Sequence, residues 1–194
     1  MSVMHDDFLT RYSHLATLFP EGLPLCELGP GRADPAAREK LASLADAELF
    51  DNRPVKNRTL ARCCLSGLWL VFDHLDESHT ISQEISTVEG SYWHGIMHRR
   101  EPDYGNAKYW FHRVPRHPVF ERLGQAAREL FARHKSSDPY ADFLEHEQGW
   151  DAPAFIDLCQ AIALKKARCE QLAREVAMAE WRLLFAFCYE GAVR

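Results

Sequence analysis

The sequence lacks the cysteine patterns of a metal or redox site. Its six cysteines are scattered, apart from the adjacent Cys63 and Cys64, and no C-x-x-C pair occurs. Cys159 and Cys188 lie among apolar residues, where a reduced cysteine behaves as a small hydrophobic side chain. Because no signal peptide is recognisable, we expect free thiols in a protein of the reducing cytoplasm.

The sequence also lacks a membrane-spanning apolar run, two common motifs of functional sites and the signals of β-strands. The apolar run Leu68–Phe72 is far shorter than the roughly 20 residues that cross a bilayer, so no membrane partner is expected. The Gly-Pro-Gly at 29–31 lacks the lysine and the strand-to-helix setting of a phosphate loop, and no G-x-S-x-G elbow occurs. Strand signals are nearly absent, because no segment alternates convincingly and no Asn-Gly hairpin appears.

Size and charge narrow the class of protein. A chain of 194 residues with 46% hydrophobic and 26% charged residues fits one globular domain. The net charge of −5 argues against a nucleic-acid partner, which requires a basic face. Between Arg99 and Arg116, however, five basic residues accompany only two acids. This local excess favours a small anionic molecule as the partner.

Helical periodicity predicts an all-α fold, a single-domain bundle of about six or seven helices over residues 1–194. The most strongly patterned helix carries a stripe of apolar residues at 3/4 spacing, which we expect to lie in the core. A Pro- and Gly-rich segment around 19–35 reads as irregular, and Asp34 before Pro35 predicts a helix start. The stripe consists of Leu65, Leu68, Trp69, Phe72 and Leu75, and the other helices are expected at about 35–50, 90–101, 106–114, 118–134, 152–165 and 167–191.

The striped helix changes character at its C-terminal end. If it continues past Leu75, then Asp76, His79 and Gln83 occupy the same face as the apolar stripe. Buried polar groups need partners. We therefore expect another polar segment to meet these side chains inside the molecule.

The segment HGIMHRREPDYGNAKYW, from His94 to Trp110, is the natural partner. On a helix, His94, His98 and Glu101 share one narrow sector, and two imidazoles four residues apart can bind one divalent ion. Histidines with a carboxylate suit zinc, iron or manganese and leave positions open for substrate. The alternative is a metal-free network in which these side chains bond to one another. The expected metal ligands are His94, His98 and Asp76, with Glu101, His79 or Glu77 as alternative ligands. The expected acid–base residues are His79, Glu101 and Asp103.

The basic part of this segment predicts an anion site. Arg99, Arg100 and Lys108 can contact a carboxylate or phosphate. Asn106 and Trp110 complete the expected substrate-binding set, with the aromatic ring as a stacking wall. The alternative is that the cations are solvated and the tryptophan belongs to the core.

Three stretches, DESHTISQ, GSYWHGIMHRREPDYGNAKYWFHRV and HPVF, together resemble an uncharacterised family of bacterial and fungal proteins. The resemblance covers about residues 67–120 and implies no activity. It implies one recurring group of residues: Asp76, Glu77, His79, Gln83, His94, His98, Arg99, Arg100, Glu101, Asp103, Asn106, Lys108 and Trp110.

Three functions remain open from the sequence. The leading hypothesis is a small-molecule enzyme with an internal polar pocket for an anionic substrate, assisted by one divalent metal ion. The second is a non-catalytic ligand-binding or sensor module that uses the same pocket. The third is a protein-interaction module with an exposed basic helix, which requires Arg99, Arg100 and Lys108 to be accessible.

Overall fold

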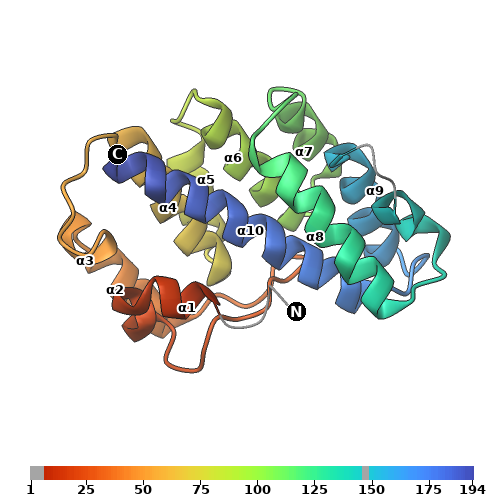
Figure 1. Ribbon diagram of the computed structural model, residues 1–194, viewed down its shortest axis with the longest axis horizontal. Helices are drawn as coiled ribbons and strands as arrows, with labels where there is room; N and C mark the ends of the chain where they lie inside the picture. The colour runs from red at the N-terminus through yellow and green to blue at the C-terminus, as the bar shows by residue number, and fades with distance from the viewer. Residues whose placement is uncertain (1–6, 146–148) are drawn as a thin grey trace.

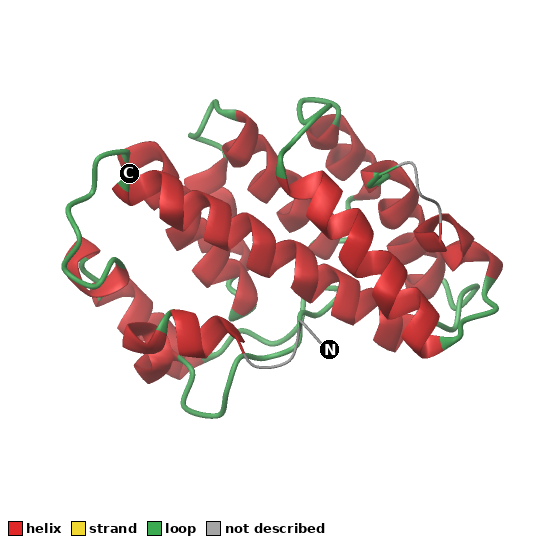
Figure 2. Ribbon diagram, in the orientation of Figure 1, coloured by secondary structure: helices red, strands yellow, loops and turns green. Residues whose placement is uncertain are grey.

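The computed structural model describes residues 7–145 and 149–194, and this part of the chain contains helices and no strand (Figures 1 and 2). The predicted all-α class is confirmed. The predicted count of six or seven helices is too low, because the described residues form ten α-helices and two 3-10 helices. Their bounds are α1 Asp7–Arg11, η1 Ser13–Leu18, α2 Pro35–Ser43, α3 Asp46–Leu49, α4 Arg58–Val71, α5 Leu75–Ser82, α6 Val88–Arg100, α7 Tyr104–Phe111, α8 Val119–His134, η2 Pro139–Glu145, α9 Ala152–Ala163 and α10 Glu170–Val193.

The additional helices are short. α1, α3 and the two 3-10 helices contain four to seven residues each, too few to establish a periodic apolar pattern. The helix expected from Pro35 to Phe50 is divided into α2 and α3. Its predicted start is correct, since the Asp34 side chain accepts a hydrogen bond from Ala36 N at 2.9 Å. None of the described helices is both long and apolar enough to cross a membrane.

The striped helix does not continue past Leu75, which corrects the expectation of one long helix. α4 ends at Val71, Asp73 adopts a left-handed backbone conformation with φ of 63°, and α5 starts afresh at Leu75. The side chain of Asp73 accepts a hydrogen bond from Arg32 N at 3.0 Å and forms an ion pair with Arg100. These long-range contacts hold a backbone conformation that is unfavourable for a non-glycine residue.

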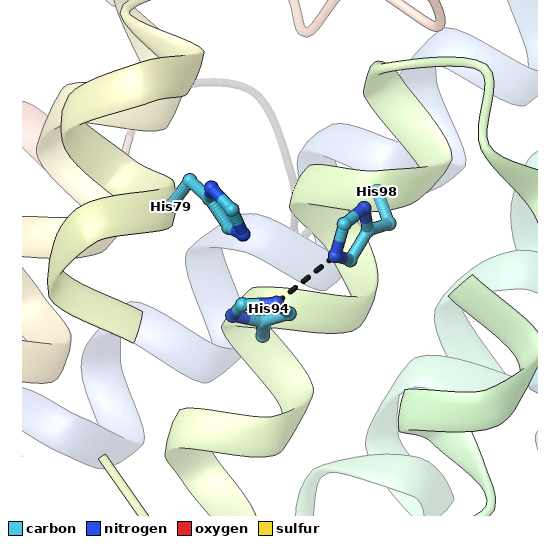
Figure 3. A group of neighbouring side chains, drawn as sticks. All are labelled: His79, His94 and His98. Atoms are coloured by element: carbon cyan, nitrogen blue, oxygen red, sulfur yellow. Dashed lines mark hydrogen bonds between the residues drawn. The ribbon is translucent and has the colours of Figure 1, made fainter. Parts of the chain in front are cut away.

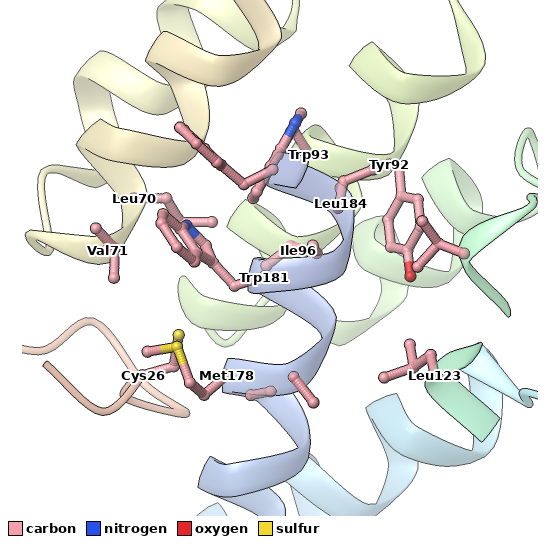
Figure 4. Close-up of a cluster of buried hydrophobic side chains, with 14 of the residues drawn as sticks. Cys26, Leu70, Val71, Tyr92, Trp93, Ile96, Leu123, Met178, Trp181 and Leu184 are labelled. Carbon is pink, nitrogen blue, oxygen red and sulfur yellow. The ribbon is translucent and has the colours of Figure 1, made fainter. Parts of the chain in front are cut away.

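The C-terminal helix α10 forms the centre of the core and packs against α4 and α8 (Figures 1 and 4). Trp181 of α10 is buried, and its Nε1 donates to Gly67 O of α4 at 2.7 Å. A side chain at Gly67 would come within 2.8 Å of the Trp93 ring, so glycine permits this close packing. From the predicted stripe, Leu68, Trp69 and Phe72 are buried, and Leu65 packs against the core while partly exposed.

Helix α6 lies between α5 and α7 and contacts both. Every residue from Gly90 to Arg100 is buried. α6 starts where Thr87 Oγ1 accepts from Gly90 N at 3.3 Å. A Cβ atom at Gly95 would lie 2.8 Å from the Phe111 ring, so this glycine lets α7 approach α6 closely. The central position of α6 directs its polar side chains to its neighbours.

Candidate metal centre

Three histidines converge between α5 and α6 (Figure 3). His79 comes from α5, and His94 and His98 come from α6. One ligand atom from each lies within 4.8 Å of the others. The two α6 imidazoles are buried and the third is half-buried. The group can hold a metal ion.

The spacing of the two α6 histidines explains half of this geometry. Residues four apart on a helix lie one above the other, and the Nε2 atoms of His94 and His98 are 2.9 Å apart. His79 completes the group because α5 packs beside α6. A contact between α4 and α5 holds α5 in place, since the Ser66 and Ser78 hydroxyls lie 3.0 Å apart.

The outer nitrogen atoms of the two α6 imidazoles have protein partners. Ser82 Oγ lies 3.0 Å from His94 Nδ1, and the same hydroxyl donates to His79 O at 3.3 Å. His98 Nδ1 lies 3.1 Å from a Glu101 carboxylate oxygen. Partners of this kind orient metal-binding histidines, because they hold the ring and set which nitrogen carries the hydrogen. Sequence reasoning missed Ser82, although it lies three residues after His79 on α5.

The surroundings keep both imidazoles neutral. Burial, followed by the nearby His98 and His79, lowers the pKa of His94 from 6.5 to about 3. Burial also lowers the pKa of His98, against the opposing effect of the Glu101 carboxylate. Neutral imidazole is the form that binds metal ions.

Helix α7 forms the other wall of the centre. The Asn106 side-chain amide lies 3.1 Å from His98 Nε2. The Trp110 ring lies 4.1 Å from the His94 ring, measured between centroids, and the Arg113 guanidinium lies 5.0 Å from the Trp110 ring centroid. Asn106 and Trp110 therefore adjoin the histidines, where sequence reasoning expected substrate to bind.

The predicted carboxylates are placed differently. Asp76 is exposed in the first turn of α5 and is not part of the histidine group. Asp76 would share the face of the apolar stripe only on one continuous helix, and the chain breaks at Asp73 between α4 and α5. Asp103 accepts a hydrogen bond from Asn106 N at 3.1 Å and so caps α7. Glu101 is the partner of His98, and its side chain is 46% exposed.

The three predicted anion-binding cations all pair with carboxylates of the protein. Arg99 contacts Glu180 of α10 at 2.5 Å and lies over the Phe155 ring at 4.6 Å. Arg100 donates to Gly29 O at 2.6 Å, in addition to its ion pair with Asp73, and Lys108 contacts Asp157 at 2.5 Å.

The sequence predicted an anion site at Arg99 and Arg100, whereas both side chains form ion pairs with carboxylates of the protein. Successive residues on a helix are rotated by about 100°, so these arginines project from other faces of α6 than His98 does. Both are buried, with exposures of 2% and 3%, and α6 therefore presents no exposed basic face there. No family model, curated protein or solved structure matches this chain.

Proposed function

We propose that the protein is a metal-dependent enzyme that acts on a small molecule, with one divalent ion held by His79, His94 and His98. The observation that carries the proposal is the 2.9 Å approach of the two Nε2 atoms on α6. The direction in which the Ser82 hydroxyl donates decides whether the side chains alone satisfy this approach or whether a cation is required.

A neutral imidazole carries one hydrogen, and the partners of the Nδ1 atoms decide where it lies. The Glu101 carboxylate can only accept hydrogen bonds. The hydrogen of the neutral His98 ring therefore lies on Nδ1, which donates to Glu101. The Ser82 hydroxyl has one hydrogen, and when it donates that hydrogen to His79 O, it accepts from His94 Nδ1. In that arrangement neither Nε2 atom carries a hydrogen, so neither can donate to the other across 2.9 Å, and only His98 Nε2 has the Asn106 amide as a second neighbour.

A cation held by the three histidines would satisfy both Nε2 atoms in that arrangement. A proton is a poor candidate at neutral pH, because burial lowers the pKa of both His94 and His98. A divalent metal ion fits, since it binds neutral imidazoles and His79 supplies a third ligand. Imidazole ligands favour zinc or iron over manganese, which prefers oxygen ligands.

The chemistry follows from the ligand count. Three protein ligands leave at least one coordination position for water or substrate. A zinc ion held by these histidines would lower the pKa of a water ligand to about 7 and would so supply a nucleophile at neutral pH. The residues here would hold the ion and orient its ligands, and the reaction class that this supports is attack of water on a small substrate.

Elemental analysis tests the proposal. Protein purified without chelator, or reloaded with zinc, iron(II) or manganese, should contain about one ion per chain, the stoichiometry of a single three-ligand site. His94→Ala and His98→Ala should lose the ion, whereas His112→Ala should retain it, because His112 is exposed outside the centre. Turnover of small esters, amides and phosphate esters should depend on loading. A wild-type protein that binds none of the three metals, or turnover that is independent of metal, would overturn the proposal.

A further inference from the structure

The α7 wall extends from the histidines to a cation at the surface. Asn106, Trp110 and Arg113 are spaced four and three residues apart, which places them along one side of α7 and its C-terminal turn. Asn106 adjoins His98, Trp110 adjoins His94, and Arg113 lies over Trp110. The three side chains form a continuous strip that starts at the proposed metal ion.

Arg113 differs from the other arginines near the centre in its partners. Arg99 and Arg100 are buried in ion pairs with protein carboxylates. Arg113 is exposed, and within residues 7–145 and 149–194 no carboxylate forms an ion pair with it. The sequence reinforces this, because residues 104–118 include no Asp or Glu. This end of the strip therefore carries a positive charge with which no described carboxylate forms an ion pair.

We propose that the substrate of the three-histidine centre is a small anion whose carboxylate or phosphate group binds to Arg113. The inference rests on the proposed function and names the substrate class of that site. Cation–π attraction to the Trp110 ring favours this position of the guanidinium, and a guanidinium without a carboxylate partner can donate two parallel hydrogen bonds to an anion.

The distances set the size of this substrate. The Arg113 guanidinium is 5.0 Å from the Trp110 ring, and that ring is 4.1 Å from the His94 ring. A molecule that contacts both Arg113 and the metal ion therefore has to reach past the Trp110 ring, which adjoins both groups. This length fits a small organic acid or phosphate ester.

Calorimetric titration of the zinc-loaded protein with inorganic phosphate and with acetate tests the inference, at ionic strength matched with chloride. Arg113→Gln should weaken binding of at least one anion by about tenfold or more, because a charge-assisted hydrogen bond contributes about 1.5–3 kcal/mol. Arg116→Gln is the matched control. Arg116 is an exposed cation of the same acid-free segment, and its variant should bind the anion within about twofold of wild type, as expected for screened surface charge.

The outcomes separate the two proposals. If the wild type holds one ion per chain but Arg113→Gln binds phosphate and acetate as the wild type does, the substrate inference fails and the metal centre stands. Equal weakening by Arg113→Gln and Arg116→Gln means general charge attraction and also overturns the inference. A wild type that binds no metal defeats the proposed function itself. Circular dichroism and thermal melting of Arg113→Gln should match wild type, because the side chain is exposed.

Discussion

The Nε2 atoms of His94 and His98 approach to 2.9 Å on one face of α6, while the Nδ1 atoms of both rings bond to Ser82 and Glu101. The inner nitrogens thus face each other, and the outer ones are held by side chains from α5 and from the end of α6. Substitution of Ser82 or Glu101 should therefore affect the centre, as substitution of the histidines should.

Ser82→Ala should weaken metal binding by about 10–100-fold, the usual effect of removing a side chain that orients a metal-binding histidine. The hydroxyl lies 3.0 Å from His94 Nδ1, and its loss releases the ring and its tautomer. Competition with a chromogenic chelator measures the affinity. Ser86→Ala is the control, because Ser86 is exposed in the loop before α6. Equal affinities for the two variants would contradict the role of Ser82.

Gly95→Ala should destabilise the protein by about 1–3 kcal/mol, the usual cost of overpacking. The new Cβ would lie 2.8 Å from the Phe111 ring, which would force α7 away from α6. Gly105→Ala meets only one atom, at 3.9 Å, and should stabilise α7 by up to about 1 kcal/mol through helix propensity. Urea unfolding of both variants measures the contrast, and the same sign of change for both would refute this account of α6–α7 packing.

Glu180→Gln should lower the free energy of unfolding by about 3–5 kcal/mol, because it leaves a buried guanidinium without its counter-charge. Arg99 and Glu180 are exposed by only 2% and 0% at their side chains. Asp46→Asn, in the exposed ion pair with Arg58, should cost less than about 1 kcal/mol. Chemical denaturation measures the free energy of unfolding of both variants. Similar decreases for the two would contradict a larger contribution from the buried Arg99–Glu180 pair.

Stability should decrease as the pH falls below about 6.5, with a contribution from His117. Val119 N donates to His117 Nδ1 at 3.2 Å, which requires a neutral ring. Burial lowers the pKa of His117, against the opposing effect of Glu89 at 3.9 Å. A lowered pKa in the folded state means that the unfolded chain takes up the proton first, so this stability is complete above the unfolded pKa and is lost as the pH falls towards the folded one.

The measurement is urea unfolding of wild type and His117→Gln between about pH 5 and 8. The wild-type slope should exceed that of the variant by up to about 1.4 kcal/mol per pH unit. The pKa values of His94 and His98 are lowered in the same direction, so only the difference between the two proteins reports on His117. Parallel curves would show that His117 does not contribute.

Local features of the sequence predicted much of the fold. The 3.6-residue period identified the all-α class and the approximate positions of α6 to α10, because apolar periodicity depends only on neighbouring residues. The start of α2 was predictable from Asp34 for the same reason. The juxtaposition of His94 and His98 also followed from spacing, since a helix places residues four apart on one face.

Only the tertiary structure decided what these elements meet. Asp73, at the break between α4 and α5, is paired with Arg100, 27 residues away, and beyond this break Asp76 lies outside the centre while His79 belongs to it. Arg99 is paired with Glu180, 81 residues away, whereas no described carboxylate forms an ion pair with the exposed Arg113. A sequence shows which cationic side chains the protein has, whereas ion pairs between distant helices determine which of them remain available to a ligand.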